Sequence, residues 1–185
     1  MSNSDSAEVL QRLAASAERL SYSSDWKPTQ CGDSQMRIAS DGRWFHQGSE
    51  IAKPALVQLF SRLLRREGEQ YFLITPVEKL SIEVEDAPFV SINTYIEGEG
   101  SEQKLYVTTN LHDTLCVSAE HPLRVEVDPH TQEPAPYVSV GANLAVRVQR
   151  SDFYQLVDYA QERCLNEDRV MAVLSAGEWF SLGRF

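Results

Sequence analysis

Apolar and polar residues alternate along much of the chain after residue 70, and this period of two is typical of half-buried strands. Leu80, Ile82 and Val84, for example, are interleaved with serine and glutamate. Alternation and short apolar runs bounded by turn residues predict strands over residues 71–75, 80–84, 89–96, 105–109, 114–118, 123–127, 137–140 and 144–148. Hairpins are expected at residues 36–45, around Asp41-Gly42, and at residues 170–182, around Ala176-Gly177.

Three other segments place apolar residues at helical spacing. Residues 5–20 predict a first helix with a narrow, leucine- and alanine-containing stripe. A second begins at Pro54, which suits the first helical position, and is expected to end at Gly68. Its last turns would then hold Arg62, Arg65 and Arg66, which either complement the helix dipole or form an anion cradle. A third helix is predicted from Ser151 to Cys164.

One short motif occurs twice. DGRWFHQG (residues 41–48) and AGEWFSLG (residues 176–183) both read Gly-x-Trp-Phe-x-x-Gly, although the chain has only three tryptophans. The first copy precedes a predicted helix and the second follows one. The motif is therefore a working site, a turn used twice, or the remnant of a duplicated strand-and-helix unit. Trp44, beside Arg43 and His46, is the copy expected to bind a ligand, whereas Trp179 is expected to fill core.

The element order predicts an α+β protein with two small domains, divided where the pattern changes near Val77. Residues 1–76 would hold the N-terminal helix and a small α+β domain, and residues 77–185 the strand-rich domain. Up to Pro76 acidic and basic residues balance, so the net charge of −10 belongs to the second part. An acidic surface repels phosphate backbones and anionic lipid, which excludes nucleic acid and membrane as expected partners.

Other features of the sequence bear on the expected cellular location, on metal binding and on catalysis. The N-terminal residues lack the basic start and apolar centre of a secretory signal, so a cytoplasmic location is expected. Cys31, Cys116 and Cys164 have no metal-binding spacing and are expected to be reduced. The four histidines have no ligand-pair spacing either, so we expect no metal and no cofactor. No Gly-x-Ser-x-Gly or Cys–His context indicates a nucleophile, and no catalytic residue is assigned.

One region is dense in residues that bind ligands. Candidate ligand-binding residues are Arg43, Trp44, His46, Arg66, Glu67, Thr75, Glu78 and Lys79. Aromatic faces, cations and carboxylates can hold a base and its phosphates by stacking and charge-assisted hydrogen bonds. The same residue types can staple two domains together by ion pairs, and the sequence leaves both interpretations open.

The motifs DGRWFHQG, LVQLFSRLLRRE, TPVEK, EDAPFV, TTN, HPL and PYVSV followed by LAVRVQR give the chain a family resemblance. Between about Met36 and Gly183 the chain resembles the uncharacterised proteobacterial domain-of-unknown-function family 1285. The resemblance implies repeated structural elements, a pleckstrin-homology-like second domain, a nucleotide-like ligand at the domain interface and a signalling role. Gln47 stands where an acidic residue is expected.

The count of elements agrees with that fold, because seven short strands and a closing helix follow residue 77. We therefore expect a seven-strand antiparallel barrel or sandwich with a C-terminal helix and a terminal hairpin. The predicted function is non-catalytic binding of a small anionic, nucleotide-like ligand between the domains. Two alternatives stay open: an enzyme of unknown class that uses His46 and Glu78, and a protein-interaction adaptor that works through the acidic second domain.

Overall fold

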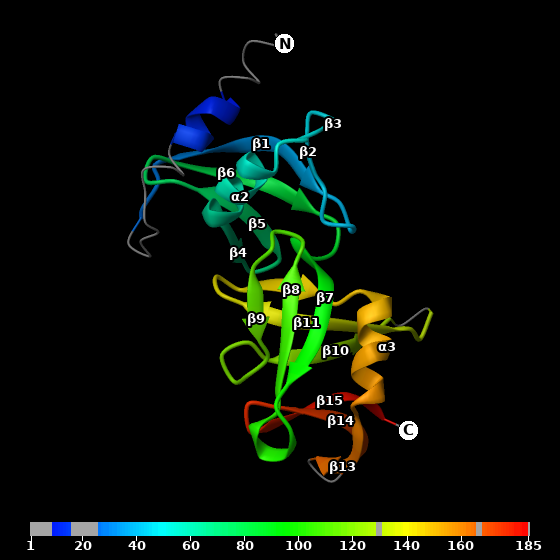
Figure 1. Ribbon diagram of the computed structural model, residues 1–185. Coiled ribbons are helices and arrows are strands. Elements are labelled where there is room, and N and C mark those ends of the chain that lie inside the picture. The colour runs from blue at the N-terminus through cyan, green and yellow to red at the C-terminus, as the bar shows by residue number, and fades with distance from the viewer. Residues whose placement is uncertain (1–8, 16–25, 129–130, 166–167, 185) are drawn as a thin grey trace. The chain divides into compact units, whose positions relative to one another are not determined.

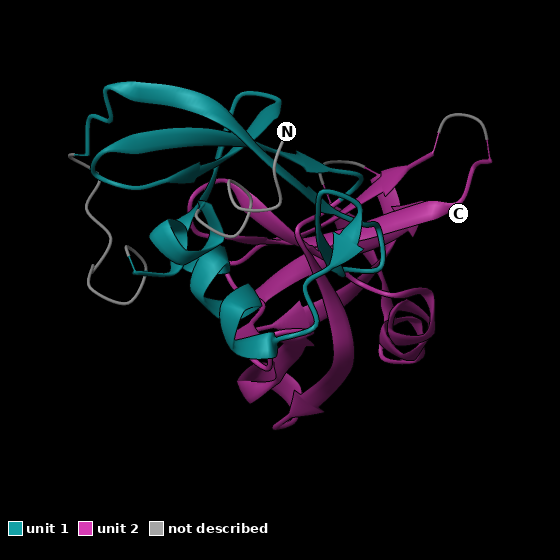
Figure 2. Ribbon diagram, turned by 90° about the horizontal axis from the view of Figure 1, so that it is seen from above, with its two compact units in different colours: residues 1–86 teal, residues 87–185 magenta. Residues whose placement is uncertain are grey.

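The computed structural model describes residues 9–15, 26–128, 131–165 and 168–184, and in them the chain is mostly β with three helices (Figure 1). The chain divides into two compact units, Met1–Asp86 and Ala87–Phe185 (Figure 2). No helix in the described ranges is long and apolar enough to cross a membrane.

Unit 1 is a six-stranded sheet with one helix packed on it. The sheet order is β3-β2-β1-β6-β5-β4. Its elements are β1 (Gln30–Ile38), β2 (Trp44–His46), β3 (Ser49–Glu50), α2 (Pro54–Leu63), β4 (Leu64–Glu67), β5 (Gln70–Ile74) and β6 (Glu78–Val84). Each half of the sheet is a local antiparallel meander, and the halves are joined by the parallel pairing of β1 with β6.

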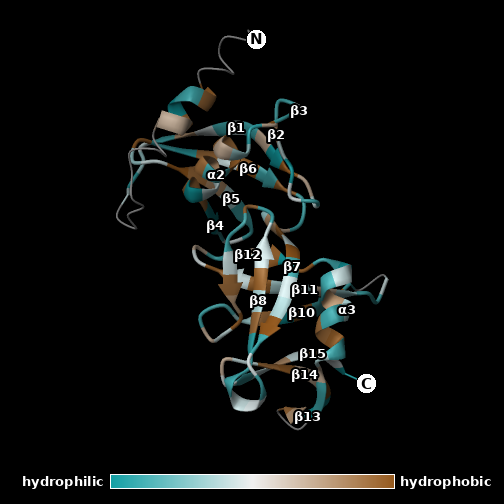
Figure 3. Ribbon diagram, in the orientation of Figure 1, coloured by the Kyte–Doolittle hydropathy of each residue, from teal (hydrophilic) through white to brown (hydrophobic). Residues whose placement is uncertain are grey.

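The core of unit 1 lies between α2 and the sheet. Pro54 starts the helix, and Val57, Phe60 and Leu63 are buried along one face, as their three- and four-residue spacing predicts. The ring of Phe60 packs against Trp44, with 6.5 Å between ring centroids. The hydrophobic residues of α2 stand out in Figure 3. Burial of the two aromatic rings fixes the helix on the sheet.

An ion pair joins the helix at residues 9–15 to the sheet of unit 1. Leu13 is fully buried. Arg12 donates from Nε and Nη2 to the two carboxylate oxygens of Glu78, each over 3.0 Å. This bidentate pair satisfies a carboxylate that is otherwise buried at the start of β6.

Unit 2 contains two sheets and one helix. Its elements are β7 (Phe89–Glu97), η1 (Gly100–Glu102), β8 (Lys104–Thr109), β9 (Thr114–Cys116), β10 (Leu123–Val127), β11 (Pro134–Val140), β12 (Leu144–Arg147), α3 (Arg150–Asp158), β13 (Gln161–Leu165), β14 (Asp168–Ser175) and β15 (Glu178–Arg184). A six-stranded sheet has the order β10-β11-β12-β7-β8-β9, and β13-β14-β15 form a separate meander. Apolar residues from both sheets and α3 form one core cluster.

Helix α3 is tied to β7 by a buried serine and a buried aspartate. The hydroxyl of Ser91 accepts a hydrogen bond from the backbone N–H of Gln149, at 2.8 Å, and donates one to the carboxylate of Asp152. Gln149 is the N-cap residue and makes no side-chain cap. Ser91 therefore supplies, from a neighbouring strand, the capping oxygen that the helix lacks.

Three sequence predictions need correction. The domain boundary falls after Asp86 and not after Pro76, because β6 pairs with β1 and β5 and so belongs to unit 1. Helix α2 ends at Leu63, and Arg65 and Arg66 lie on β4, where they pair with β5. Helix α3 ends at Asp158, and Cys164 lies on β13, paired with β14. In all three places strand pairing overrides the local pattern.

The expected all-antiparallel barrel of the second domain is also wrong in its pairing. Val146 and Arg147 of β12 pair in parallel with Phe89 and Val90 of β7, and this pair joins two three-stranded meanders. One repeat does exist at the level of elements. Each of α2 and α3 is followed by a three-stranded antiparallel meander, β4-β5-β6 and β13-β14-β15 respectively.

The two Gly-x-Trp-Phe-x-x-Gly copies form different turns. Gln47 and Gly48 of the first copy have φ values of 50° and 81°, as a two-residue type I′ turn requires. In the second copy that turn is built by Ala176 and Gly177, at 51° and 82°. The equivalent turn therefore lies at the end of one copy and at the start of the other.

Removal of the Glu78 charge should destabilise unit 1. Glu78→Gln leaves Arg12 with a neutral partner, and loss of a charged, largely buried hydrogen-bonded pair costs about 1–3 kcal/mol in free energy of unfolding. Urea unfolding followed by far-UV circular dichroism measures the change. Glu83→Gln, an exposed glutamate on the same strand, is the matched control and should differ by less than about 0.5 kcal/mol.

Candidate functional site

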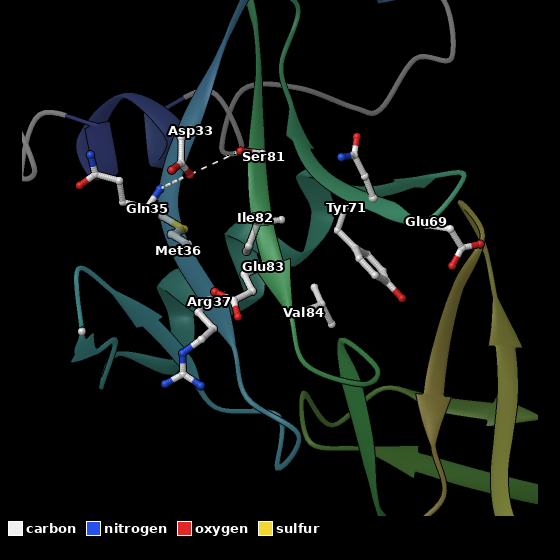
Figure 4. A pocket seen from close by; sticks show the side chains of 12 residues that line it. Asp33, Gln35, Met36, Arg37, Glu69, Tyr71, Ser81, Ile82, Glu83 and Val84 are labelled. Atoms are coloured by element: carbon white, nitrogen blue, oxygen red, sulfur yellow. Dashed lines mark hydrogen bonds between the residues drawn. The ribbon is translucent and has the colours of Figure 1, made fainter. Parts of the chain in front are cut away.

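A groove of about 570 Å³ crosses the sheet of unit 1 (Figure 4). Its lining comes from β1, β6, β5 and the turns beside them: Asp33, Gln35, Met36, Arg37, Gly48, Glu69, Gln70, Tyr71, Ser81, Ile82, Glu83 and Val84. The β2–β3 turn reaches one part of the groove through Gly48, and the β4–β5 turn reaches another through Glu69. The volume lies in the range of small-molecule sites.

The groove opens at a break in the β1–β6 ladder. Parallel pairing runs from Gln30 to Asp33, stops, and resumes at Arg37 with a shifted register. Gln35, in the break, has a φ of 56°. Three residues of β1 here lie opposite a single residue of β6, which is a β-bulge, a feature enriched beside binding sites.

Short polar side chains hold the bulge. The carboxylate of Asp33 accepts the backbone N–H of Gln35 at 2.8 Å. The hydroxyl of Ser34 donates to the carbonyl oxygen of Ser81 at 2.7 Å and accepts the N–H of Met36 at 3.2 Å. These bonds replace ladder hydrogen bonds that the bulge removes, so the bulge is fixed by the local sequence DSQM.

Acidic groups outnumber basic ones in the lining. Asp33, Glu69 and Glu83 contribute carboxylates, and Arg37 contributes the one cation of the lining. Arg37 is itself ion-paired with Glu85 and lies 4.5 Å from the ring centroid of Phe45. The groove therefore presents hydrogen-bond acceptors and excess negative charge, which favour a polar ligand with a cationic group.

None of the eight candidate residues lines this groove. Of the charged ones, Glu78 pairs with Arg12 of the first helix, and the others pair with carboxylates or cations of unit 1 nearer in the chain. Arg43 pairs with Asp41 at 2.7 Å and with Glu50 at 3.3 Å. Lys79 pairs with Glu67.

Arg66 lies closer to the groove. It pairs with Glu69 at 3.3 Å and lies 5.5 Å from the ring centroid of Tyr71, and both of those partners line the groove. These charges therefore form ion pairs, but the pairs lie within unit 1 and do not join the two domains.

Trp44 is core rather than ligand surface. Its side chain is 1% exposed, and its Nε1 has no hydrogen-bond partner among the described residues. Trp179, expected in the core, is instead partly exposed, with the guanidinium of Arg163 4.1 Å from its ring centroid. Trp44 is therefore core and Trp179 is not fully buried, because Trp44 packs against Phe60 of α2 while Trp179 lies on the terminal meander.

Thr75 and Glu78 form hydrogen bonds with each other that fix the turn before β6. The hydroxyl of Thr75 accepts the backbone N–H of Glu78 at 3.0 Å, and the two residues also bond through their main chains. His46 lies opposite Met36 on β1, whereas Glu78 lies opposite Gln30. Six residues of strand span roughly 20 Å. His46 and Glu78 therefore do not form the acid–base pair considered from the sequence.

The groove residues were missed because they carry no distinctive signal. The segment QCGDS is rich in turn-forming residues and shows no alternation, and Ser81 and Glu83 match the solvent-facing half of an alternating strand. Within the described ranges no group of three or more metal-ligating side chains comes together. All three cysteines are free thiols.

Comparison with protein families follows the same division into two parts. Residues 23–87 match the N-terminal domain of a domain of unknown function, DUF1285, and residues 88–182 match the DUF1285 C-terminal domain. The chain belongs to the DUF1285 family. The family predicted from the sequence motifs is therefore confirmed, and the helix at residues 9–15 precedes the matched region.

Two solved structures are similar to the chain. A DUF1285 family protein from Silicibacter pomeroyi DSS-3 is 40% identical, with a TM-score of 0.80 over 93% of this chain and 94% of that one. A DUF1285 family protein from Shewanella baltica OS155 is 25% identical, with a TM-score of 0.52 over 66% of this chain and 90% of that one. No curated protein matches the chain.

The two tryptophans should differ in what they contribute to stability. Trp44→Ala removes a fully buried ring and should lower the free energy of unfolding by about 3–5 kcal/mol. Trp179→Ala removes a partly exposed ring and should cost about 1 kcal/mol. Urea unfolding of both variants measures this difference. Equal losses would contradict the assignment of Trp44 to the core.

Burial of His46 should make stability depend on pH. Desolvation lowers the pKa of the His46 imidazole below its ordinary value. The unfolded chain therefore takes up a proton before the folded protein does, and stability present at neutral pH is lost as the pH falls through the folded pKa. Unfolding of the wild type and His46→Gln at pH 7.5 and 5.5 should show a smaller pH-dependent loss in the variant. An equal pH-dependent loss in the two proteins would contradict this role of His46.

Proposed function

We propose that this protein is a non-catalytic binding module and that the groove of unit 1 is its small-molecule site. The observation that carries the proposal is the groove at the β1 bulge, with its polar lining and its adequate volume. Side chains on rigid strands surround it, so the site is largely preformed.

The charge of the lining defines the class of ligand. The lining holds three carboxylates and one arginine, Arg37, which is already paired with Glu85. A phosphate here would meet repulsion from Glu83 and Asp33, so the anionic, nucleotide-like ligand expected from the sequence is less suited to this groove. A small amine or guanidine with further hydrogen-bonding groups fits better. Tyr71, which lines the groove (Figure 4), supplies an aromatic ring for such a cation, and the guanidinium of Arg66 already lies 5.5 Å from its centroid.

A non-catalytic role is favoured because the lining has no histidine or cysteine beside its carboxylates and Ser81, and Ser81 is held at 3.4 Å from Asp33 at the bulge. The alternative enzyme has less support, because its two proposed residues lie on β2 and β6, separated by β1.

For unit 2, the likeness to the pleckstrin-homology fold stays a proposal. Two three-stranded meanders followed by a helix support it. The parallel β12–β7 pair and the strands after α3 depart from the expected order. The likeness implies no phosphoinositide binding, because acidic residues dominate the β7–β8 connection, residues 97–102.

Ligand binding can be tested with two probes of opposite charge. Titration of the ¹⁵N-labelled chain with agmatine should shift amide resonances of β1, β5 and β6 saturably, whereas AMP should not. Glu83→Gln should weaken agmatine binding by about tenfold, since it removes one charge-assisted contact. Asp113→Asn, an exposed carboxylate of unit 2, is the matched control and should bind as wild type.

Native mass spectrometry of freshly purified protein complements the titration, because a retained molecule reveals its own mass. Preferential binding of AMP at the groove would overturn the charge argument. If agmatine and AMP both leave the β1, β5 and β6 resonances unmoved and no molecule is retained, the groove is not a ligand site.

A further inference from the structure

Strand β7 has one edge that is only partly occupied. Residues 91–97 pair with β8 on one side. On the other side β12 pairs only with Phe89 and Val90. In the part of the chain that the structure describes, no strand adjoins that side from Ile92 to Glu97, and α3 packs beside β7 instead (Figure 1). A strand edge with unpaired backbone groups is a template for another extended chain.

A groove of about 280 Å³ lies between this edge and α3, entirely within unit 2. Thr94 and Tyr95 line it from β7, and Asp158 and Tyr159 from the C-terminal end of α3. Thr94 is 5% exposed, yet its hydroxyl has no hydrogen-bond partner among the described residues. A buried hydroxyl left unpaired costs free energy, so this one is poised to bond with a molecule in the groove.

Exposed apolar side chains gather on the same two elements. Seven large hydrophobic residues are exposed in the described ranges. Five of them lie on β7, on α3 or at its C-cap: Ile92, Tyr95, Tyr154, Val157 and Tyr159. Tyr95 and Tyr159 line the groove itself, and the other three lie on the same two elements. Isolated apolar residues are normal on a surface, but several on two neighbouring elements are typical of an interaction site.

The charges around the groove favour a positively charged ligand. Asp158 sits in the last turn of α3, where the helix dipole is negative and no basic residue lies. A carboxylate there is unfavourable by itself and strengthens the local negative potential. Glu97 is exposed at the end of β7. Residues 87–185 as a whole hold 14 acidic against 7 basic residues.

We propose that the β7–α3 groove binds an extended peptide segment that carries an arginine or lysine. The peptide backbone lies along the part of the β7 edge that α3 leaves open and bonds to its backbone groups, as in other cases of strand addition. One basic side chain enters the groove, beside Tyr95 and Tyr159, and pairs with Asp158. The Thr94 hydroxyl bonds to the peptide, and the flanking apolar side chains of the peptide cover Ile92 and Val157.

The test uses the whole ¹⁵N-labelled protein and two synthetic peptides, acetyl-Val-Arg-Val-Thr-Val-amide and the same peptide with glutamate in place of arginine. The arginine peptide should shift the amide resonances of residues 92–96 and 155–159 saturably and bind at least tenfold more tightly than the glutamate peptide. Asp158→Asn should weaken the arginine peptide by five- to tenfold and reduce its advantage, while Asp158→Glu should retain most of the binding. Thr94→Val, which keeps the side-chain shape, should weaken both peptides severalfold.

Asp113→Asn removes an exposed carboxylate from a different part of unit 2 and should bind as wild type. Thermal melts establish that each variant is folded. The proposal fails if the two peptides bind equally, if the shifts lie outside β7 and α3, or if neither peptide binds at millimolar concentration. If arginine amide binds as tightly as the arginine peptide, the groove is a small-cation site and the peptide proposal is wrong. The outcome is independent of the agmatine titration, which reports on unit 1.

Discussion

The parallel pairing of β1 with β6 is the constraint on which unit 1 depends. The strands on either side of it form by local hairpins, but only this pairing joins residues that lie almost fifty positions apart into one sheet. It places β6 in unit 1, so the chain leaves that unit after Asp86. Parallel strands need a crossover connection, and α2 is part of the one between β1 and β6. On this crossover Phe60 of α2 packs against Trp44 of β2, and both are buried.

Unit 2 also depends on a parallel strand pair. A short parallel pair between β12 and β7 joins two local meanders, and it ends after two residues. Both candidate binding surfaces lie where such a parallel ladder is interrupted. In unit 1 the bulge at Asp33 opens the groove, and in unit 2 the early end of the β12–β7 pair leaves an edge beside α3. Interrupted ladders leave backbone groups and concave surface that a continuous sheet would close.

Local pairing of charges explains why the most conspicuous residues of the sequence are not the site. Among the candidate residues, Arg43 and Arg66 contact carboxylates within a few residues of themselves, and Lys79 on β6 contacts Glu67 on β4, two strands away. Glu78, the most buried carboxylate of that set, is held by Arg12. These contacts stabilise hairpin ends and fasten the first helix, and the groove is lined by less conspicuous residues such as Ser81 and Glu83.

The sequence by itself determined most strands, the places of the three helices and the family, but not β4, β13 or the first half of β1. Period-two alternation, Pro54 at a helix start and glycines at positive φ are local signals, and almost every strand predicted from residue 71 onward was found. It could not determine which strands pair, because β6 alternates in the same way whether it joins β1 or β7. The helical pattern wrongly predicted that Arg65, Arg66 and Cys164 lie on helices. They lie on strands, because hydrogen bonding to a partner strand outweighs a marginal helical pattern. Only the tertiary structure decided that Trp44 is core and that a bulge at Asp33 opens a groove. Burial and register depend on residues far away in the chain, and no local pattern encodes them.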